Sequence, residues 1–182
     1  MKRSVQLLLS LSLALLAASS AAAGKLRPGD QPPDYLGHNI DGDDVHVSDF
    51  AGRAVVVSYW ATWCPYCLKE LPILNNIQRV AGKDRLAVVA VNVESRDTFR
   101  AARRALADTL DVNFAWDPGK RSQHAYVVTG LPHLVIIGRD GRIVSIHVGY
   151  GEGALTAIAE ELNTALAATP PAPAASSVTP TP

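Results

Sequence analysis

The two cysteines of this 182-residue chain, Cys64 and Cys67, are separated by two residues and follow a continuous apolar run. That run, residues 54–60, consists of β-forming residues and predicts a strand buried on both faces. The residues after the pair, to about Val80, are expected to form a helix. The sequence therefore predicts Cys64 at the first turn of a helix, just behind a core strand, and Cys67 one turn further in.

This arrangement favours redox chemistry at Cys64. The first turn of a helix has unpaired backbone N–H groups and the positive end of the helix dipole, which stabilise a thiolate. Pro65 suits the first helical position, because its missing N–H would have had no helical partner. Cys67 lies close enough to attack a mixed disulfide formed at Cys64. An exposed nucleophile and a buried resolving thiol are therefore expected.

Two other uses of the cysteine pair fit the sequence less well. A structural disulfide stabilises a fold by closing a long loop, and a two-residue gap closes almost none. A zinc site needs four ligands, typically a second cysteine pair or spaced histidines. No two of the five histidines have the local spacing of a zinc motif: His38, His46, His124, His133 and His147. The pair is interpreted as a redox-active disulfide, with no metal and no other cofactor expected.

The two ends of the chain differ in composition from the region between them. Residues 1–23 have a basic start, an apolar run over residues 7–18 and small residues before Gly24, which predicts a cleaved secretory signal peptide. An uncleaved membrane anchor is the alternative, although the run is shorter than the roughly 20 residues that span a bilayer. Residues 169–182, rich in Pro, Ala and Thr, predict a disordered tail after a domain of residues 24–168.

Export would place the two thiols in a periplasmic or other extracytoplasmic compartment, where disulfides persist. All 17 acidic residues follow position 23, whereas two of the 17 basic residues, Lys2 and Arg3, precede it. The exported chain would thus carry a small negative charge, which gives no indication of nucleic-acid binding.

The region between the ends alternates predicted strands and helices. Asp41-Gly42 predicts a hairpin turn, with the alternating residues 45–50 forming a strand after it. A second buried strand is expected at residues 85–93, and a hairpin around residues 139–141. Phe99, Ala102, Leu106 and Leu110 recur at helical spacing and predict an amphipathic helix from about Asp97. A last helix has one apolar face: Leu155, Ile158, Leu162 and Leu166. Together these elements predict an α/β fold with a central mixed sheet covered by helices on both faces.

The segment "VVVSYWATWCPYCLKELP" resembles the active-site segment of the thioredoxin superfamily. More narrowly, "WCxxC" with the later "GLP" and "RDG" is similar to the TlpA/ResA-like exported thiol–disulfide oxidoreductases, over about residues 28–168. The resemblance implies a thioredoxin-like fold with an N-terminal β-hairpin extension. It also implies that Pro132 is the family's cis-proline, beside the cysteines, and that Leu131 before it helps to shape a peptide site. Glu70 matches a glutamate near the active site of many ResA-like members.

The role of Glu70 has two readings from its position. It lies three residues after Cys67 on the same helix face, where it could take the proton of Cys67 or could be a solvated surface charge. Thioredoxin has a buried aspartate on the strand before the motif, and this chain has Ser58 there. That difference leaves Glu70 or water as the proton acceptor.

Other residues near the motif are candidates for substrate contacts. His133 follows Pro132 where family members often have threonine, and it could stabilise the Cys64 thiolate as an imidazolium or merely line the substrate groove. Trp63 is a candidate surface contact for a partner protein. Pro65 and Tyr66 lie between the cysteines and carry no charge, so they do not indicate the direction of electron flow.

The leading hypothesis is an exported, monomeric enzyme that reduces disulfides of client proteins through a Cys64 mixed disulfide resolved by Cys67. The resemblance implies apocytochrome c or oxidase copper-site cysteines as clients, and a membrane-embedded thiol–disulfide electron donor. A disulfide-forming oxidase is the nearest alternative. A Cu(I) carrier using Cys64, Cys67 and His133 is a third hypothesis, and a redox-inert binding module is a fourth.

Overall fold

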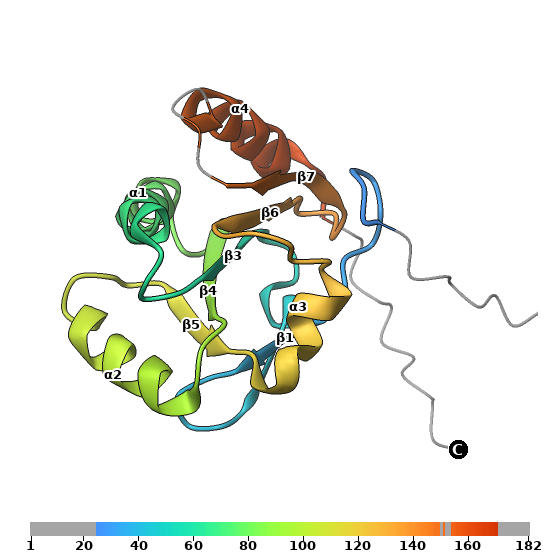
Figure 1. The fold of residues 1–182 in the computed structure, drawn as a ribbon. Coiled ribbons are helices and arrows are strands. Elements are labelled where there is room, and N and C mark those ends of the chain that lie inside the picture. The colour runs from blue at the N-terminus through green and yellow to red at the C-terminus, as the bar shows by residue number, and fades with distance from the viewer. Residues whose placement is uncertain (1–24, 150, 152–153, 171–182) are drawn as a thin grey trace, which may run out of the picture.

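A computed structural model of the chain describes residues 25–149, 151 and 154–170. Within these residues, seven strands form one mixed sheet in the order β2-β1-β5-β4-β3-β6-β7 (Figure 1). The strands are β1 (Tyr35–His38), β2 (Asp44–His46), β3 (Ala54–Trp60), β4 (Leu86–Asn92), β5 (Asn113–Trp116), β6 (His133–Ile137) and β7 (Ile143–Val148). The helices are α1 (Pro65–Ala81), α2 (Arg96–Leu106), α3 (Arg121–Ala125) and α4 (Ala154–Ala167), with short 3-10 turns η1 (Val47–Phe50) and η2 (Pro118–Lys120).

Strand β3 is an interior strand of the sheet and is buried along its whole length. It pairs in parallel with β4 and antiparallel with β6. Both expected apolar strands are confirmed, because a strand covered on both faces needs a continuous apolar sequence rather than an alternating one.

The two faces of the sheet are covered by different elements, as alternate residues of β3 show. Ala54, Val56 and Trp60 belong to clusters packed by residues of α1, α2 and α4. Val57 and Tyr59 belong to the cluster on the other face, which includes Tyr126 just after α3 and residues of η1. Figure 1 shows α1, α2 and α4 on one side of the sheet and α3 on the other. The prediction of a mixed sheet covered on both faces is confirmed.

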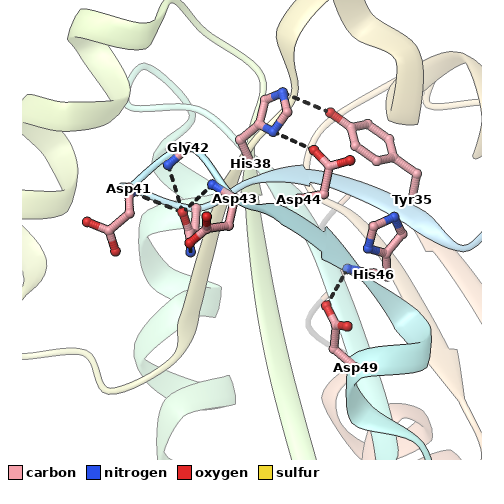
Figure 2. A network of polar contacts seen from close by, with 9 residues as sticks. Tyr35, His38, Asp41, Gly42, Asp43, Asp44, His46 and Asp49 are labelled. Carbon is pink, nitrogen blue, oxygen red and sulfur yellow. Dashed lines mark hydrogen bonds and ion pairs between the residues drawn. The ribbon is translucent and has the colours of Figure 1, made fainter.

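The expected N-terminal hairpin is present and its loop is closed by one side chain. Oδ1 of Asn39 accepts hydrogen bonds at 2.9 Å from three backbone N–H groups, those of Asp41, Gly42 and Asp43 (Figure 2). Beside the loop, Nδ1 of His38 lies 2.8 Å from Oδ1 of Asp44 across the strand pair. The loop therefore has an internal structure that fixes the register of β1 against β2.

Several predictions from the sequence need correction. Residues 47–50 form the 3-10 turn η1, not the end of a strand, because N–H of His46 bonds to Oδ2 of Asp49 at 2.8 Å and closes a turn. Leu110 lies beyond the end of α2 but packs into the same cluster as Phe99 of that helix. Strand β5 and helix α3 were not predicted, since four and five residues are too few for a clear periodic pattern.

The predicted signal peptide (residues 1–23) and most of the predicted tail (residues 171–182) lie outside the described residues. In the part of the chain that is described, no helix combines the length and the apolar character needed to cross a bilayer.

Gly37 gives a test of the junction between β1 and β5. Its φ is +144°, and a Cβ added there would lie 2.5 Å from the carbonyl oxygen of Trp116. Gly37→Ala is expected to lower the free energy of unfolding by about 3 kcal/mol, because strain and a backbone clash combine. The control is Gly42→Ala, also at positive φ but with open space around the Cβ, for which a loss of about 1 kcal/mol is expected. Equal losses in urea unfolding would contradict this close approach.

Candidate active site at the start of helix α1

Cys64 and Cys67 form a disulfide at the beginning of α1. Cys64 is the N-cap residue, and its Sγ accepts a hydrogen bond from the backbone N–H of Cys67 at 3.1 Å. Pro65 occupies the first turn, as expected for a residue without an N–H. The sulfur at position 64 thus occupies the place where a capping oxygen normally satisfies the free N–H groups of a helix.

Apolar side chains surround the pair on the helix-rich face of the sheet. Cys67 is fully buried, as expected, but Cys64 is only 4% exposed, so the expectation of an exposed nucleophile is wrong for the disulfide form. Both pack in a cluster with Trp60, Leu71 and Phe99. Because water is excluded, the local dielectric constant is low and electrostatic interactions are stronger. The N–H groups and dipole of the first turn of α1 therefore act more strongly on Cys64.

The loop before Cys64 is held by Glu94, a residue that the sequence analysis missed. Oε2 of Glu94 accepts from the backbone N–H of Thr62 at 2.6 Å, and Oε1 accepts from the Thr62 hydroxyl at 2.9 Å. The backbone carbonyl of Glu94 in turn accepts from Nε1 of Trp116 at 2.7 Å. The sequence does contain a signal for this contact. Glu94 follows β4, and the carboxyl ends of the parallel neighbours β3 and β4 lie at the same edge of the sheet.

Glu70 is buried, which contradicts its reading as a solvated surface charge. Its side chain is 4% exposed, and the hydroxyl of Ser58 on β3 donates to Oε1 at 2.9 Å. Burial raises the pKa of Glu70, while the hydrogen bond from Ser58 and the charge of His147 lower that pKa. The structure thus brings together Ser58 and Glu70 one helical turn from Cys67.

The peptide bond between Leu131 and Pro132 is cis, as the resemblance implied. Leu131 packs against the cluster that contains both cysteines. The carbonyl of Pro132 is engaged inside the fold, where it accepts from the N–H of Gly149 at 2.8 Å. The backbone N–H and C=O of Leu131 have no hydrogen-bond partner among the described residues.

His133 does not provide an imidazolium beside Cys64. Its side chain is 2% exposed, and burial lowers its pKa to about 4, so the ring is neutral near pH 7. His133 pairs with Tyr59 across the strands, and the two rings meet edge to face at 5.8 Å. Tyr59 lies on the sheet face that α3 covers, opposite the cysteines. Paired residues share a face, so His133 points away from Cys64.

The same placement bears on the copper hypothesis. A soft trigonal site would need His133 beside Cys64 and Cys67, and the sheet lies between them. Among the described residues, no group of three or more His, Cys, Asp or Glu side chains could hold a metal ion.

Two aromatic side chains next to the cysteines in the sequence are exposed at the protein surface. Trp63 is 67% exposed and Tyr66 is 51% exposed, although both are large and partly apolar. Pro65 between them is also exposed, and Nζ of Lys69 lies 5.6 Å from the centre of the Tyr66 ring. These side chains provide an apolar surface next to the disulfide, of the kind that partner proteins contact.

A disulfide capping a helix that follows a buried interior strand, next to a cis-proline loop, defines a thiol–disulfide oxidoreductase with a thioredoxin-like fold. Residues 27–164 match the Redoxin family, and the chain belongs to this family as a ResA/TlpA-like member of the thioredoxin superfamily.

Named relatives agree with this class. The chain is 36% identical over 125 residues to thioredoxin-like protein YneN of Bacillus subtilis strain 168, covering 68% of this chain and 73% of YneN. It is 28% identical over 149 residues to thiol-disulfide oxidoreductase ResA of the same strain, covering 80% and 82% of the two chains. A crystal structure from Chlorobium tepidum, described as thiol:disulfide interchange protein DsbE, matches with a TM-score of 0.69 and 30% identity, over 78% of this chain and 99% of that one.

The buried neutral state of His133 predicts a specific acid sensitivity. Because the pKa falls from 6.5 unfolded to about 4 folded, the unfolded chain binds the proton first as the pH drops. The stabilising contribution is complete above pH 6.5 and is lost toward pH 4, about 3 kcal/mol in all. His133→Leu should remove this loss, as measured by urea unfolding of the oxidised protein at pH 7 and pH 4. The control is the exposed His124, whose replacement by Gln should leave the acid sensitivity unchanged. If His133→Leu loses as much stability between pH 7 and pH 4 as the wild type does, protonation of His133 is not the cause of the acid sensitivity.

Proposed function

We propose that this protein is an extracytoplasmic enzyme that reduces disulfides in client proteins. The observation that carries the proposal is the sulfur of Cys64 at the N-cap of α1, with the N–H of Cys67 directed at it from 3.1 Å. In the reduced protein the same N–H and the helix dipole stabilise a thiolate, which is the attacking form of a cysteine.

The reaction proceeds by two exchanges of sulfur–sulfur bonds. The Cys64 thiolate attacks one sulfur of the client disulfide, forms a Cys64–client bond and releases the other client sulfur as a thiolate. Glu70 then takes the proton of Cys67, and the Cys67 thiolate attacks Sγ of Cys64, which releases the second client sulfur. The client gains two electrons, and the enzyme ends as the Cys64–Cys67 disulfide.

The surroundings of Glu70 support its part in the second exchange. Burial raises the pKa of Glu70, which makes its carboxylate a stronger base than an exposed carboxylate. Its pKa is then closer to that of a thiol, so proton transfer from Cys67 is easier. Cys67 is fully buried, so its proton needs an acceptor inside the protein. Glu70 lies one turn along the same helix and can accept this proton, and its Oε1 accepts a hydrogen bond from the hydroxyl of Ser58.

The client is an extended, partly apolar segment containing a cysteine. The N–H and C=O of Leu131, which have no partner among the described residues, can bond to the backbone of such a segment, as an added strand does at a sheet edge. The exposed side chains of Trp63 and Tyr66, near Cys64 in the chain, supply apolar contacts for this segment. Cysteine-containing segments of apocytochromes c or of oxidase copper sites are the client class, as the resemblance to ResA-like proteins implies.

The enzyme works outside the cytoplasm as a monomer, after cleavage of residues 1–23, and a membrane thiol–disulfide donor reduces the disulfide for the next cycle.

A disulfide-forming oxidase is the second candidate, and the helix N-terminus favours it in part. A stabilised Cys64 thiolate favours the reduced enzyme, which makes the pair more oxidising. Equilibration with a glutathione redox buffer decides between them: a potential well above that of glutathione would overturn the reductase proposal.

Single cysteine variants test the order of the two steps. Cys67→Ser is expected to accumulate a covalent client adduct, because the first exchange proceeds and the second cannot. Cys64→Ser is the matched control and should form no adduct, with insulin reduction at the uncatalysed rate. Both are read by non-reducing electrophoresis of extracytoplasmic extracts and by insulin turbidity. Adducts with Cys64→Ser but not Cys67→Ser would reverse the assignment of nucleophile and resolving thiol.

A further inference from the structure

The described part of α4 contributes one charged group to the edge of the sheet, and that group meets a histidine. Oε2 of Glu161 lies 2.5 Å from Nε2 of His147 on β7, and it also accepts from the hydroxyl of Ser145 at 2.7 Å. The side chains of His147 and Glu161 are 23% and 28% exposed, so the pair is mostly covered. These contacts fix the imidazole ring in one orientation.

The sheet register places His147 on the same face as the residues around Glu70. Ser58 of β3 pairs with Leu134 of β6, and Leu134 pairs with His147 of β7. Directly paired residues share a face, so the three side chains form a row under the helices. Helices α1 and α4 both cover this face: Leu74 and Ile158 belong to the same apolar cluster, and Figure 1 shows both helices on this side of the sheet. Glu70 meets one end of the row, and Glu161 meets the other.

We propose that His147, oriented by Glu161 and Ser145, is a positioning residue that keeps Glu70 ionised and so able to accept the proton of Cys67. The inference rests on the proposed role of Glu70 in the second exchange. His147 touches neither client nor sulfur in this scheme and acts only through its charge.

The electrostatic surroundings of Glu70 support this role. Burial raises its pKa, and two groups oppose that rise: the hydrogen bond from Ser58 and the charge of His147. Ser58 of β3 is in direct contact with Glu70, and Cys67 lies three residues before it on the same helix. His147 of β7 lies further along the row, beyond the apolar Leu134 of β6, and the acidic Glu161 of α4 contacts His147. Without His147, the hydroxyl of Ser58 alone would offset burial, and Glu70 would hold its proton to higher pH.

The test follows the two exchanges separately with a small aromatic disulfide, 5,5′-dithiobis(2-nitrobenzoate), in stopped flow. Attack by Cys64 releases the first thionitrobenzoate, and attack by Cys67 on the resulting mixed disulfide releases the second. His147→Gln should move the acid limb of the second phase to higher pH and leave the first phase unchanged. His147→Lys places a fixed positive charge at the same position and should restore the limb. The remote, exposed His124→Gln is the matched control and should behave as wild type.

Glu70→Gln separates failure of the inference from failure of the proposed function. If Glu70→Gln abolishes the acid limb and His147→Gln leaves it at the wild-type pH, His147 does not act on Glu70 and the inference alone fails. If Glu70→Gln keeps the limb, both fail. In the double variant, His147→Gln should add nothing to Glu70→Gln. Equal slowing of both phases by His147→Gln and His147→Lys would show that the pair only ties β7 to α4, which also overturns the inference.

Discussion

The junction between β3 and α1 is the constraint on which the rest of the structure depends. A strand buried on both faces ends at Trp60, and a 17-residue helix begins at Pro65, with the sulfur of Cys64 as its cap. The short connection leaves the chain little freedom, and Glu94 fixes it further by holding Thr62 from the neighbouring strand end. The position of the reactive sulfur is therefore set by the core of the protein and not by a mobile loop.

The sheet also separates two kinds of buried polar group. On the face of α1, the carboxyl of Glu70 accepts a hydrogen bond from Ser58, and Ser58 and His147 both lower a pKa that burial raises. On the face of α3, His133 is buried without a hydrogen-bond partner among the described residues and stays neutral. Burial alone gives a group that resists charging, whereas burial with a partner gives one that can titrate in a useful range.

Much of the fold could be predicted because its central elements have strong patterns. The apolar run of β3 and the helical spacing of α2 and α4 give clear signals, and Pro65 with Cys64 marks a helix start. Strand β5 has four residues and α3 has five, so neither repeats a pattern long enough to recognise. The side on which His133 lies depends on its pairing with Tyr59, and register shifted by one residue would reverse it. The contacts of Glu94 and of the His147–Glu161 pair depend on tertiary placement in the same way.

The acidity of the Cys64 thiol is the most direct measure of whether a helix start activates this sulfur. In the reduced Cys67→Ser variant, the ultraviolet absorbance of the thiolate and the rate of iodoacetamide alkylation report Cys64 alone as the pH is raised. A pKa clearly below the ordinary thiol value of about 8.5 is expected, since the first turn of α1 stabilises the anion. A Cys64 that titrates at or above about 8.5 would contradict the account, because an unactivated thiol there could not start the exchange.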